Sequence, residues 1–320
     1  MRRRSLLHWT AATLVVAARA PAGLPAAPLR LVATTALIAD LVGRVAGDRA
    51  RLQVLVGEGV DPHTYRPTRA DIVAMRRADA VFANGFRLEA QLEGFLEELA
   101  RERLVVRLAE RLPEERLLAN PTFPGRFDPH VWMEVALWRS LASIVARELA
   151  RLDPSAERVF FERARDYEAE LERLESYVRD VLATVPREQR VLVTAHDAFG
   201  YFGRAYSFEV IGIQGISTES EAGLADIERL VRLVVERRIP AVFVETSVAE
   251  RNVMAIVEGA RARGHRIRIG GRLFSDSLGA PGTYEGTYIG MIDHNVTTIA
   301  RALGGEAPAG GFQGRLNGIE

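Results

Sequence analysis

The sequence contains no cysteine and no lysine. Without cysteine the chain cannot form disulfides, offer thiolate ligands to a metal or carry a lipid on a cysteine, so we expect it not to be a lipoprotein. The fold must therefore be held together by a hydrophobic core, and 320 residues are enough to build one. A chain of this length is also expected to form two domains.

The charge has no excess of either sign. The 42 basic and 42 acidic residues give a formal net charge of zero. A strongly basic surface, the usual sign of a protein that binds nucleic acid or an anionic membrane, is therefore not expected. We predict no nucleic-acid partner.

Long hydrophobic runs are also lacking. The mostly apolar stretch at residues 6–18 is shorter than the about 20 residues that a membrane-spanning helix needs. It follows Arg2-Arg3-Arg4 and precedes small residues, a pattern typical of a secretory signal. We assign residues 1–28 to a signal peptide and expect the mature protein in the periplasm. A twin-arginine signal and an ordinary signal with a basic head fit this stretch equally well.

Strand and helix patterns alternate along the rest of the chain, which predicts an α/β fold. In the first half the expected strands are residues 29–34, 51–56, 80–83 and 104–108. In the second half they are residues 191–194, 209–213, 241–245 and 266–270. Helical patterns between them indicate a parallel sheet flanked by helices in each half. We predict an N-terminal lobe over residues 29–154, a C-terminal lobe over 186–310 and a flexible tail over 311–320.

One long helical pattern separates the two predicted lobes. Residues 156–184 contain no glycine or proline and carry an apolar stripe. At 1.5 Å per residue this helix would be roughly 40 Å long. We interpret residues 155–185 as a rigid connecting helix with a cleft between the lobes. The irregular charges beside the stripe argue against the alternative, a coiled-coil partner helix.

Four residues are candidate ligands for a metal ion in that cleft: His63, His130, His196 and Asp276. Each follows an expected strand or precedes an expected helix, and the carboxyl ends of parallel strands are where such folds bind ligands. Three imidazoles and one carboxylate suit a borderline divalent metal in a roughly tetrahedral site. The four are far apart in the sequence and no short metal motif joins them, so spacing alone leaves a shared site as a hypothesis.

Two further carboxylates could orient ligand imidazoles. Asp197 follows His196 directly, and Glu245 ends an expected strand. A metal-bound histidine usually donates its second ring N–H to a carboxylate or a carbonyl, which gives these residues a role. Local capping or pairing is an equally good interpretation of each.

Six stretches spread over the mature chain share the pattern of one protein family: GVDPHTYRPT, FDPHVWM, VTAHDAFGYFGRAYSFEVIGIQGISTESEAG, VFVETS, GGRLFSDSLG and GTYEGTYIGMIDHN. Together they resemble the metal-binding receptors of bacterial ABC importers for manganese and zinc, the group named cluster A-I, whose lobes are joined by a rigid helix. The likeness is strongest to the treponemal-type zinc/manganese receptors. The resemblance implies that His63, His130, His196 and Asp276 are the metal ligands.

The resemblance also implies a function. The protein would be a monomeric receptor, not an enzyme, that captures Zn²⁺ or Mn²⁺ as cargo and delivers it to the permease and ATPase of an importer. Zinc-specialised members often carry a histidine-rich loop between the first two ligands, which residues 110–127 lack. Dedicated manganese members often have glutamate at the third position, where this chain has His196. Zinc and manganese therefore both remain candidates for the cargo metal, with iron as a third candidate.

Two other classes of function compete with a transport receptor. Catalytic zinc keeps an open position for water or substrate, so four protein ligands argue against a zinc-dependent hydrolase. A surface adhesin that merely holds metal is the second alternative, and the sequence has neither repeats nor a cysteine anchor for it. For a receptor, the rigid connecting helix predicts only a small rearrangement when the metal binds.

Overall fold

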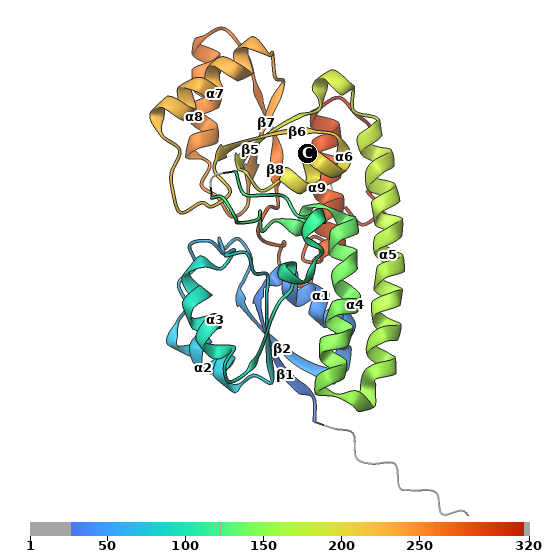
Figure 1. Cartoon of the computed structure of the whole chain (residues 1–320). Helices are drawn as coiled ribbons and strands as arrows, with labels where there is room; N and C mark the ends of the chain where they lie inside the picture. Colours follow the sequence, from blue (N-terminus) through green and yellow to red (C-terminus); the bar gives the residue numbers. More distant parts are fainter. Residues whose placement is uncertain (1–26, 122, 317–320) are drawn as a thin grey trace, which may run out of the picture.

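A computed structural model describes residues 27–121 and 123–316. Two lobes lie one above the other, and a long helix runs beside both (Figure 1). The predicted two-lobed α/β architecture is confirmed. The assigned signal peptide lies outside the described residues, apart from its last two positions. Within the described ranges, no helix is both long and apolar enough to cross a membrane.

The N-terminal lobe contains a four-stranded parallel sheet in the order β2-β1-β3-β4. Its strands are β1 (Leu29–Thr35), β2 (Ala50–Val56), β3 (Ala80–Ala83) and β4 (Leu104–Arg107). Its helices are α1 (Ala36–Ala46), α2 (Arg69–Arg77) and α3 (Glu93–Leu99). Successive residues of β1 pack into different hydrophobic clusters. Leu31 packs in the cluster that contains α1, and Val32 packs with α2 and α3. Burial on both faces is typical of a parallel sheet.

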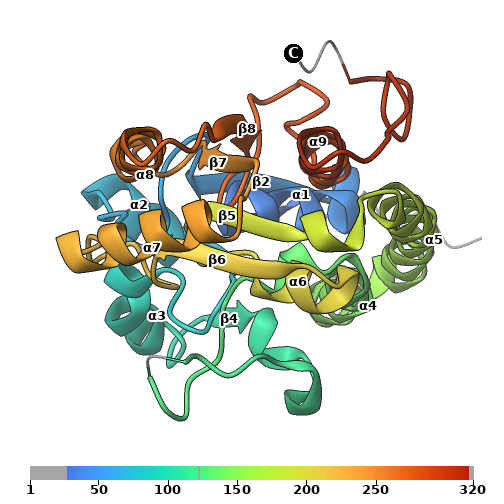
Figure 2. The same cartoon turned by 90° about the horizontal axis from the view of Figure 1, so that it is seen from above.

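The C-terminal lobe contains two parallel strand pairs. One pair is β5 (Val191–His196) with β6 (Glu209–Gln214), and the other is β7 (Ala241–Glu245) with β8 (Arg268–Leu273). Strand β5 lies beside β7. Helices α7 (Leu224–Glu236) and α8 (Arg251–Ala262) pack on one face of these strands, as the view from above shows (Figure 2). Helices α6 (Gly200–Tyr206) and α9 (Tyr288–Ala302) contribute to the core on the other face.

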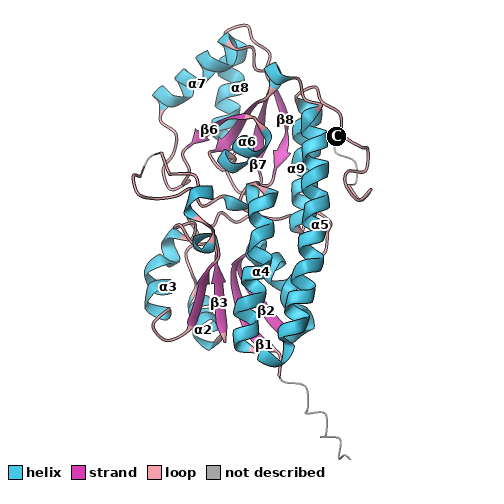
Figure 3. Cartoon of the chain, turned by 45° about the vertical axis from the view of Figure 1, so that its right-hand side comes forward, coloured by secondary structure: helices cyan, strands magenta, loops and turns pink. Residues whose placement is uncertain are grey.

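Helix α5 (Glu157–Ala183) has 27 residues and extends along both lobes, antiparallel to α4 (Val135–Leu152) (Figures 1 and 3). Its buried side chains form the expected stripe: Phe160, Ala164, Tyr167, Leu171, Leu174, Val178, Val181 and Leu182. Helices α1 and α9, one from each lobe, also contact α5. A single hydrophobic cluster therefore continues from β1 through α5 into β7 and α9. The lobes share a core instead of being joined by one isolated helix.

Short 3-10 turns connect several of these elements. They are Gly47–Arg49, Ala90–Leu92, Ala109–Arg111, Glu114–Arg116, Val131–Met133, Pro154–Ala156 and Arg187–Gln189.

The glycine-rich C-terminal segment differs from the expected flexible tail. Over its described part, Phe312 donates its backbone N–H to the buried carboxylate of Asp293 at 2.7 Å, and Leu316 is only 5% exposed. A Cβ on Gly311, whose φ is +70°, would lie 2.4 Å from that carboxylate. Because Gly311 has no Cβ, the backbone can approach the buried Asp293 carboxylate closely. The hydrogen bond from Phe312 then holds the segment in place. Residues 317–320 lie outside the described range.

Candidate metal centre

The four candidate ligands meet between the lobes. One donor atom from each of His63, His130, His196 and Asp276 lies within 4.8 Å of the others, and all four residues are at most 1% exposed. Asp276 is central: its oxygens lie 3.1 Å from Nε2 of His196, 3.5 Å from Nε2 of His130 and 3.8 Å from Nε2 of His63. The two first-lobe histidines have their Nε2 atoms 3.3 Å apart. The structure thus brings together all four residues that the sequence singled out.

His63 occupies a turn between β2 and α2. The carboxylate of Asp61 accepts the backbone N–H of His63 at 2.8 Å, which closes the turn. Helix α2 then begins with a capping box: the hydroxyl of Thr68 accepts the N–H of Asp71, and the Asp71 carboxylate accepts the N–H of Thr68. The chain is thus fixed on both sides of His63.

His130 is oriented by the aspartate two residues before it. One oxygen of Asp128 accepts both the backbone N–H of His130 at 2.9 Å and its Nδ1–H at 2.7 Å. The proton on Nδ1 leaves Nε2 free to face the other donors. Trp132 lies edge-on to the ring, with centroids 5.2 Å apart, and its indole N–H donates to the Ser275 carbonyl at 2.8 Å. That bond ties the His130 turn to the loop of Asp276.

His196 ends β5 and is oriented by Glu245, which ends the neighbouring strand β7. The Glu245 carboxylate accepts the backbone N–H of His196 at 2.9 Å and lies 2.6 Å from its Nδ1. Glu245 is fully buried, so this contact holds the ring with Nε2 toward Asp276. The geometry gives Glu245 the orienting position that the sequence suggested.

Asp197 takes a different position. Its side chain lines a cavity beside residues 212–222, and in the described structure no hydrogen bond joins its carboxylate to a candidate ligand. Asp128 fills the orienting role instead, although the sequence patterns above did not single it out. The sequence does contain a signal for Asp128, because the motif Asp-Pro-His occurs twice. Each copy places a carboxylate two residues before a histidine, which is the spacing of an Asx turn.

Burial and mutual charge set the protonation of the cluster. Burial lowers the pKa of His63 to about 3, so its imidazole is neutral at pH 7. Burial would also lower the pKa of His196, but the charges of Asp276 and Glu245 outweigh it and raise that pKa well above 6.5. Burial would raise the pKa of Asp276, but the neighbouring His196 holds it below its usual range. At neutral pH His63 is thus neutral, while His196 is an imidazolium beside the Asp276 carboxylate.

The donor set fits a divalent cation. Nε2 of His196 and both oxygens of Asp276 are buried, and they hydrogen-bond to no group outside the cluster. Burying such a set of polar atoms is costly, and a metal ion would satisfy all of them. Donors held about 2.0–2.1 Å from a tetrahedral zinc lie about 3.3 Å apart, close to the 3.1–3.8 Å separations around Asp276.

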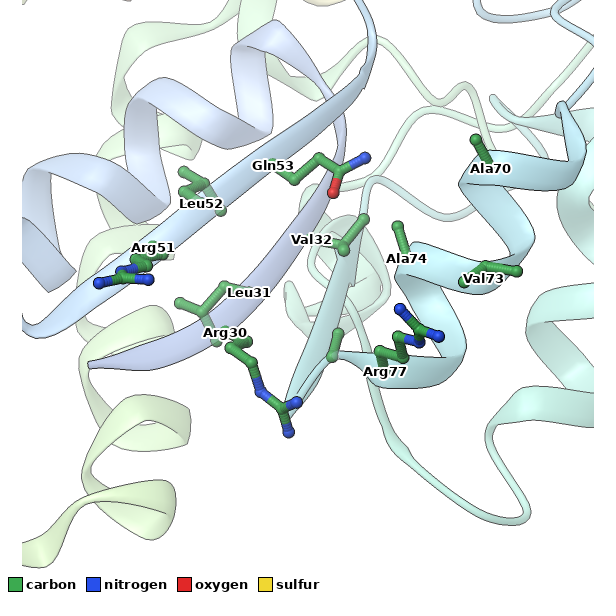
Figure 4. Close-up of a pocket in the computed structure, with 11 residues that line it drawn as sticks. Arg30, Leu31, Val32, Arg51, Leu52, Gln53, Ala70, Val73, Ala74 and Arg77 are labelled. Atoms are coloured by element: carbon green, nitrogen blue, oxygen red, sulfur yellow. The ribbon is translucent and has the colours of Figure 1, made fainter. Parts of the chain in front are cut away.

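A groove in the first lobe lacks such donors. A groove of about 440 Å³ lies between α2 and the edge of the first-lobe sheet, lined by Arg30, Arg51, Arg77 and mostly apolar side chains (Figure 4). No histidine or carboxylate lines it, so it offers a cation nothing to bind. A smaller cavity of about 190 Å³ is lined by His63 and leads toward the candidate centre.

The chain matches one family of known proteins over most of its length. The sequence model of ZnuA, described as zinc-uptake complex component A periplasmic, matches residues 31–302. Zinc-binding protein TroA of Treponema pallidum is 44% identical over 273 residues, which is 85% of this chain and 88% of that protein. The manganese-binding lipoprotein MntA of Bacillus subtilis is 41% identical over 276 residues, 86% of this chain and 90% of that protein.

Solved structures show the same fold. The periplasmic zinc-binding protein TroA from Treponema pallidum superposes with a TM-score of 0.84 at 43% identity, covering 86% of this chain and 99% of that one. The Fe(III)-bound YtgA from Chlamydia trachomatis has a TM-score of 0.78 at 29% identity, covering 86% of this chain and 98% of that one.

Proposed function

We propose that this chain captures a divalent transition metal and delivers it to an ABC importer. The chain belongs to the family of the periplasmic zinc-uptake complex component A, and this membership is the premise of the proposal. The observation that carries the proposal is the buried cluster of three imidazoles and one carboxylate. In this cluster, Nε2 of His196 and both oxygens of Asp276 hydrogen-bond to no group outside the cluster. A buried set of this kind is explained by a cation that it holds.

In this proposal His63, His130, His196 and Asp276 bind the ion, while Asp128 and Glu245 orient two of the imidazoles. Each lobe supplies two of the four donors, so the ion ties the lobes together. The ligands must be deprotonated at the atoms that bind, so capture is coupled to proton release.

The cargo is Zn²⁺ or Mn²⁺. One relative is named for zinc and another for manganese, so family membership leaves both open. Three imidazoles favour zinc, and zinc exceeds manganese in the general order of affinities at nitrogen and oxygen sites. We propose that zinc binds this chain more tightly than manganese, whichever metal is transported.

Binding without catalysis is the role that the donor count supports. Four protein donors fill a tetrahedral site, whereas a catalytic zinc keeps a position open for water or substrate. Hydrolytic turnover that disappears in His196→Ala would instead favour a zinc-dependent hydrolase. An adhesin that merely holds metal is the other alternative, and adjacent genes for a permease and an ATPase would argue against it.

We place the protein in the periplasm as a monomer whose partners are the permease and ATPase of a metal importer, with no nucleic-acid partner. The matched family is described as periplasmic. Several relatives are named lipoproteins, which contradicts the expectation that this protein is not one.

Alanine replacement of each proposed ligand tests the site. His63→Ala, His130→Ala, His196→Ala and Asp276→Ala should each weaken zinc binding by at least about 100-fold, because each removes one of four donors. Calorimetric titration with zinc and with manganese measures this, and circular dichroism checks that the fold is kept. His265→Ala is the matched control, since His265 faces the Ile239 carbonyl outside the cluster. Unchanged affinity in all four variants would refute the assignment.

A further inference from the structure

One side chain links a candidate ligand to the opposite lobe. Asp61 precedes His63 in the first lobe, and one of its oxygens accepts the His63 backbone N–H at 2.8 Å. The other oxygen accepts the hydroxyl of Thr218, at 2.5 Å, from the loop that follows β6 in the second lobe. A single carboxylate thus holds the His63 turn and a loop of the other lobe.

The loop of Thr218 has a second attachment to the first lobe. The Gln91 side-chain amide donates to the Glu219 carboxylate at 2.9 Å. Ser217 and Glu219 line the cavity of about 190 Å³ that His63 also lines. Residues 217–219 therefore lie beside the cavity that His63 lines.

His63 is the ligand for which this attachment matters most. The rings of His130 and His196 are each held at Nδ1 by a buried carboxylate, Asp128 and Glu245. Among the described residues, no carboxylate hydrogen-bonds to Nδ1 of His63. Its position therefore depends on the backbone turn that Asp61 closes.

We propose that Asp61 and Thr218 form a latch that couples closure of the Thr218 loop over the cleft to the placement of His63, and that the latch slows release of the bound metal. Asp61 is a positioning residue here, because it acts on the ion through the His63 turn. When Thr218 withdraws with its loop, Asp61 loses a donor from the opposite lobe and the turn of His63 is freed to move. The inference rests on the proposed function, since it assigns a step to that same site.

The test compares rates of zinc release in variants of one hydrogen bond. Thr218→Val keeps the shape of the side chain and removes the hydroxyl, so zinc should dissociate roughly tenfold faster, the loss expected for a hydrogen bond to a charged acceptor. Thr218→Ser keeps the hydroxyl and should dissociate at the wild-type rate. Release is followed by mixing zinc-loaded protein with an excess of a chromogenic chelator.

Thr283→Val is the matched control. Thr283 is exposed, and its hydroxyl donates to the Ala280 carbonyl at 2.7 Å and not to Asp61. If Thr218→Val releases zinc at the wild-type rate, or Thr283→Val releases it as fast as Thr218→Val, the latch is refuted while the metal site stands. A wild-type protein that binds no zinc would refute the proposed function and the latch with it. Unchanged thermal unfolding of the metal-free variants excludes a general loss of stability.

Discussion

At the residue scale, the two Asp-Pro-His motifs share one hydrogen bond and differ in the others. Both aspartates accept the backbone N–H of their histidine, but Asp128 also bonds the ring of His130, whereas Asp61 accepts a hydroxyl from the other lobe. The ring of His196 has no such aspartate and is held by Glu245 from the next strand. Two imidazoles are thus fixed by buried carboxylates, and the third is fixed through its turn.

The first prediction concerns these carboxylates. Glu245→Gln and Asp128→Asn should each weaken zinc binding about 10- to 100-fold, the range typical of residues that orient metal ligands. The amide can donate to Nδ1, which would move the ring proton to Nε2, the atom that faces the centre. Asp197→Asn should change affinity less than about threefold and serves as the control. Calorimetry measures all three, and a larger effect of Asp197 than of Asp128 would contradict the structure.

The second prediction is proton release on metal binding. The pKa of His196 in the metal-free protein is well above 6.5, so the ring carries an extra proton at pH 7, whereas His63 is neutral. Metal at Nε2 displaces that proton, so affinity should rise with pH, by about tenfold per pH unit for one proton displaced below this pKa. Calorimetry in buffers of different ionisation enthalpy should show about one proton released near pH 7.

Glu245→Gln provides the control for proton release. It removes one of the two charges that raise the pKa of His196, so fewer protons should be released at the same pH. A binding enthalpy that is the same in every buffer for the wild-type protein would show that His196 is already neutral before metal binds.

At the element scale, α5 is a structural member of both lobes. Its buried stripe contacts α4 along its length and also α1 and α9, so the helix belongs to a core that crosses the boundary between the lobes. The helix is long because no glycine or proline interrupts it, and it is fixed because its apolar face is fully covered. A wide hinge at this helix would break that packing.

The third prediction follows from this packing. Leu174→Ala in α5 should lower the free energy of unfolding by about 2–5 kcal/mol, because Leu174 is fully buried and its removal leaves a cavity. Zinc affinity should change little, since the metal centre is built from other elements. Arg173→Ala, on the exposed side of the same helix, should change stability by less than about 0.5 kcal/mol. Equal effects of the two substitutions in urea unfolding would contradict the assigned core.

At the scale of the whole molecule, the shared core makes the two lobes one cooperative unit. The hydrophobic cluster joins β1 of the first lobe to β7 and α9 of the second through α5. Hydrogen bonds such as that from the Trp132 indole to the Ser275 carbonyl add links at the metal centre. We therefore expect metal release to require local movement of loops rather than separation of the lobes.

The fourth prediction is that metal changes the shape of the molecule only slightly. The radius of gyration from X-ray scattering should differ by less than about 1 Å between metal-free and zinc-loaded protein, because α5 and the shared core prevent wide opening. Thermal unfolding of the metal-free protein should show one transition, as expected of one core. Two separate transitions, or a large change in radius, would show that the lobes move independently.

Local patterns in the sequence were sufficient to predict the elements and the candidate ligands. Strand and helix periodicities involve neighbouring residues only, so they predicted the parallel strands and the length of α5. His63, His130, His196 and Asp276 were identified because each stands at a strand end or a helix start within a family motif. Local patterns also suggested a flexible tail, although glycine there permits the close contact of Gly311 with Asp293.

Local spacing places Asp128 beside His130, but the packing of the elements decides which carboxylates bond the ligand rings. Asp128 and Asp197 are both aspartates near a candidate histidine, yet only Asp128 bonds an imidazole. The contact between Asp61 and Thr218 joins residues from different lobes, so it exists only once both lobes are packed. Hydrogen bonds between distant segments depend on the relative positions of whole elements, and the shared core around α5 sets those positions.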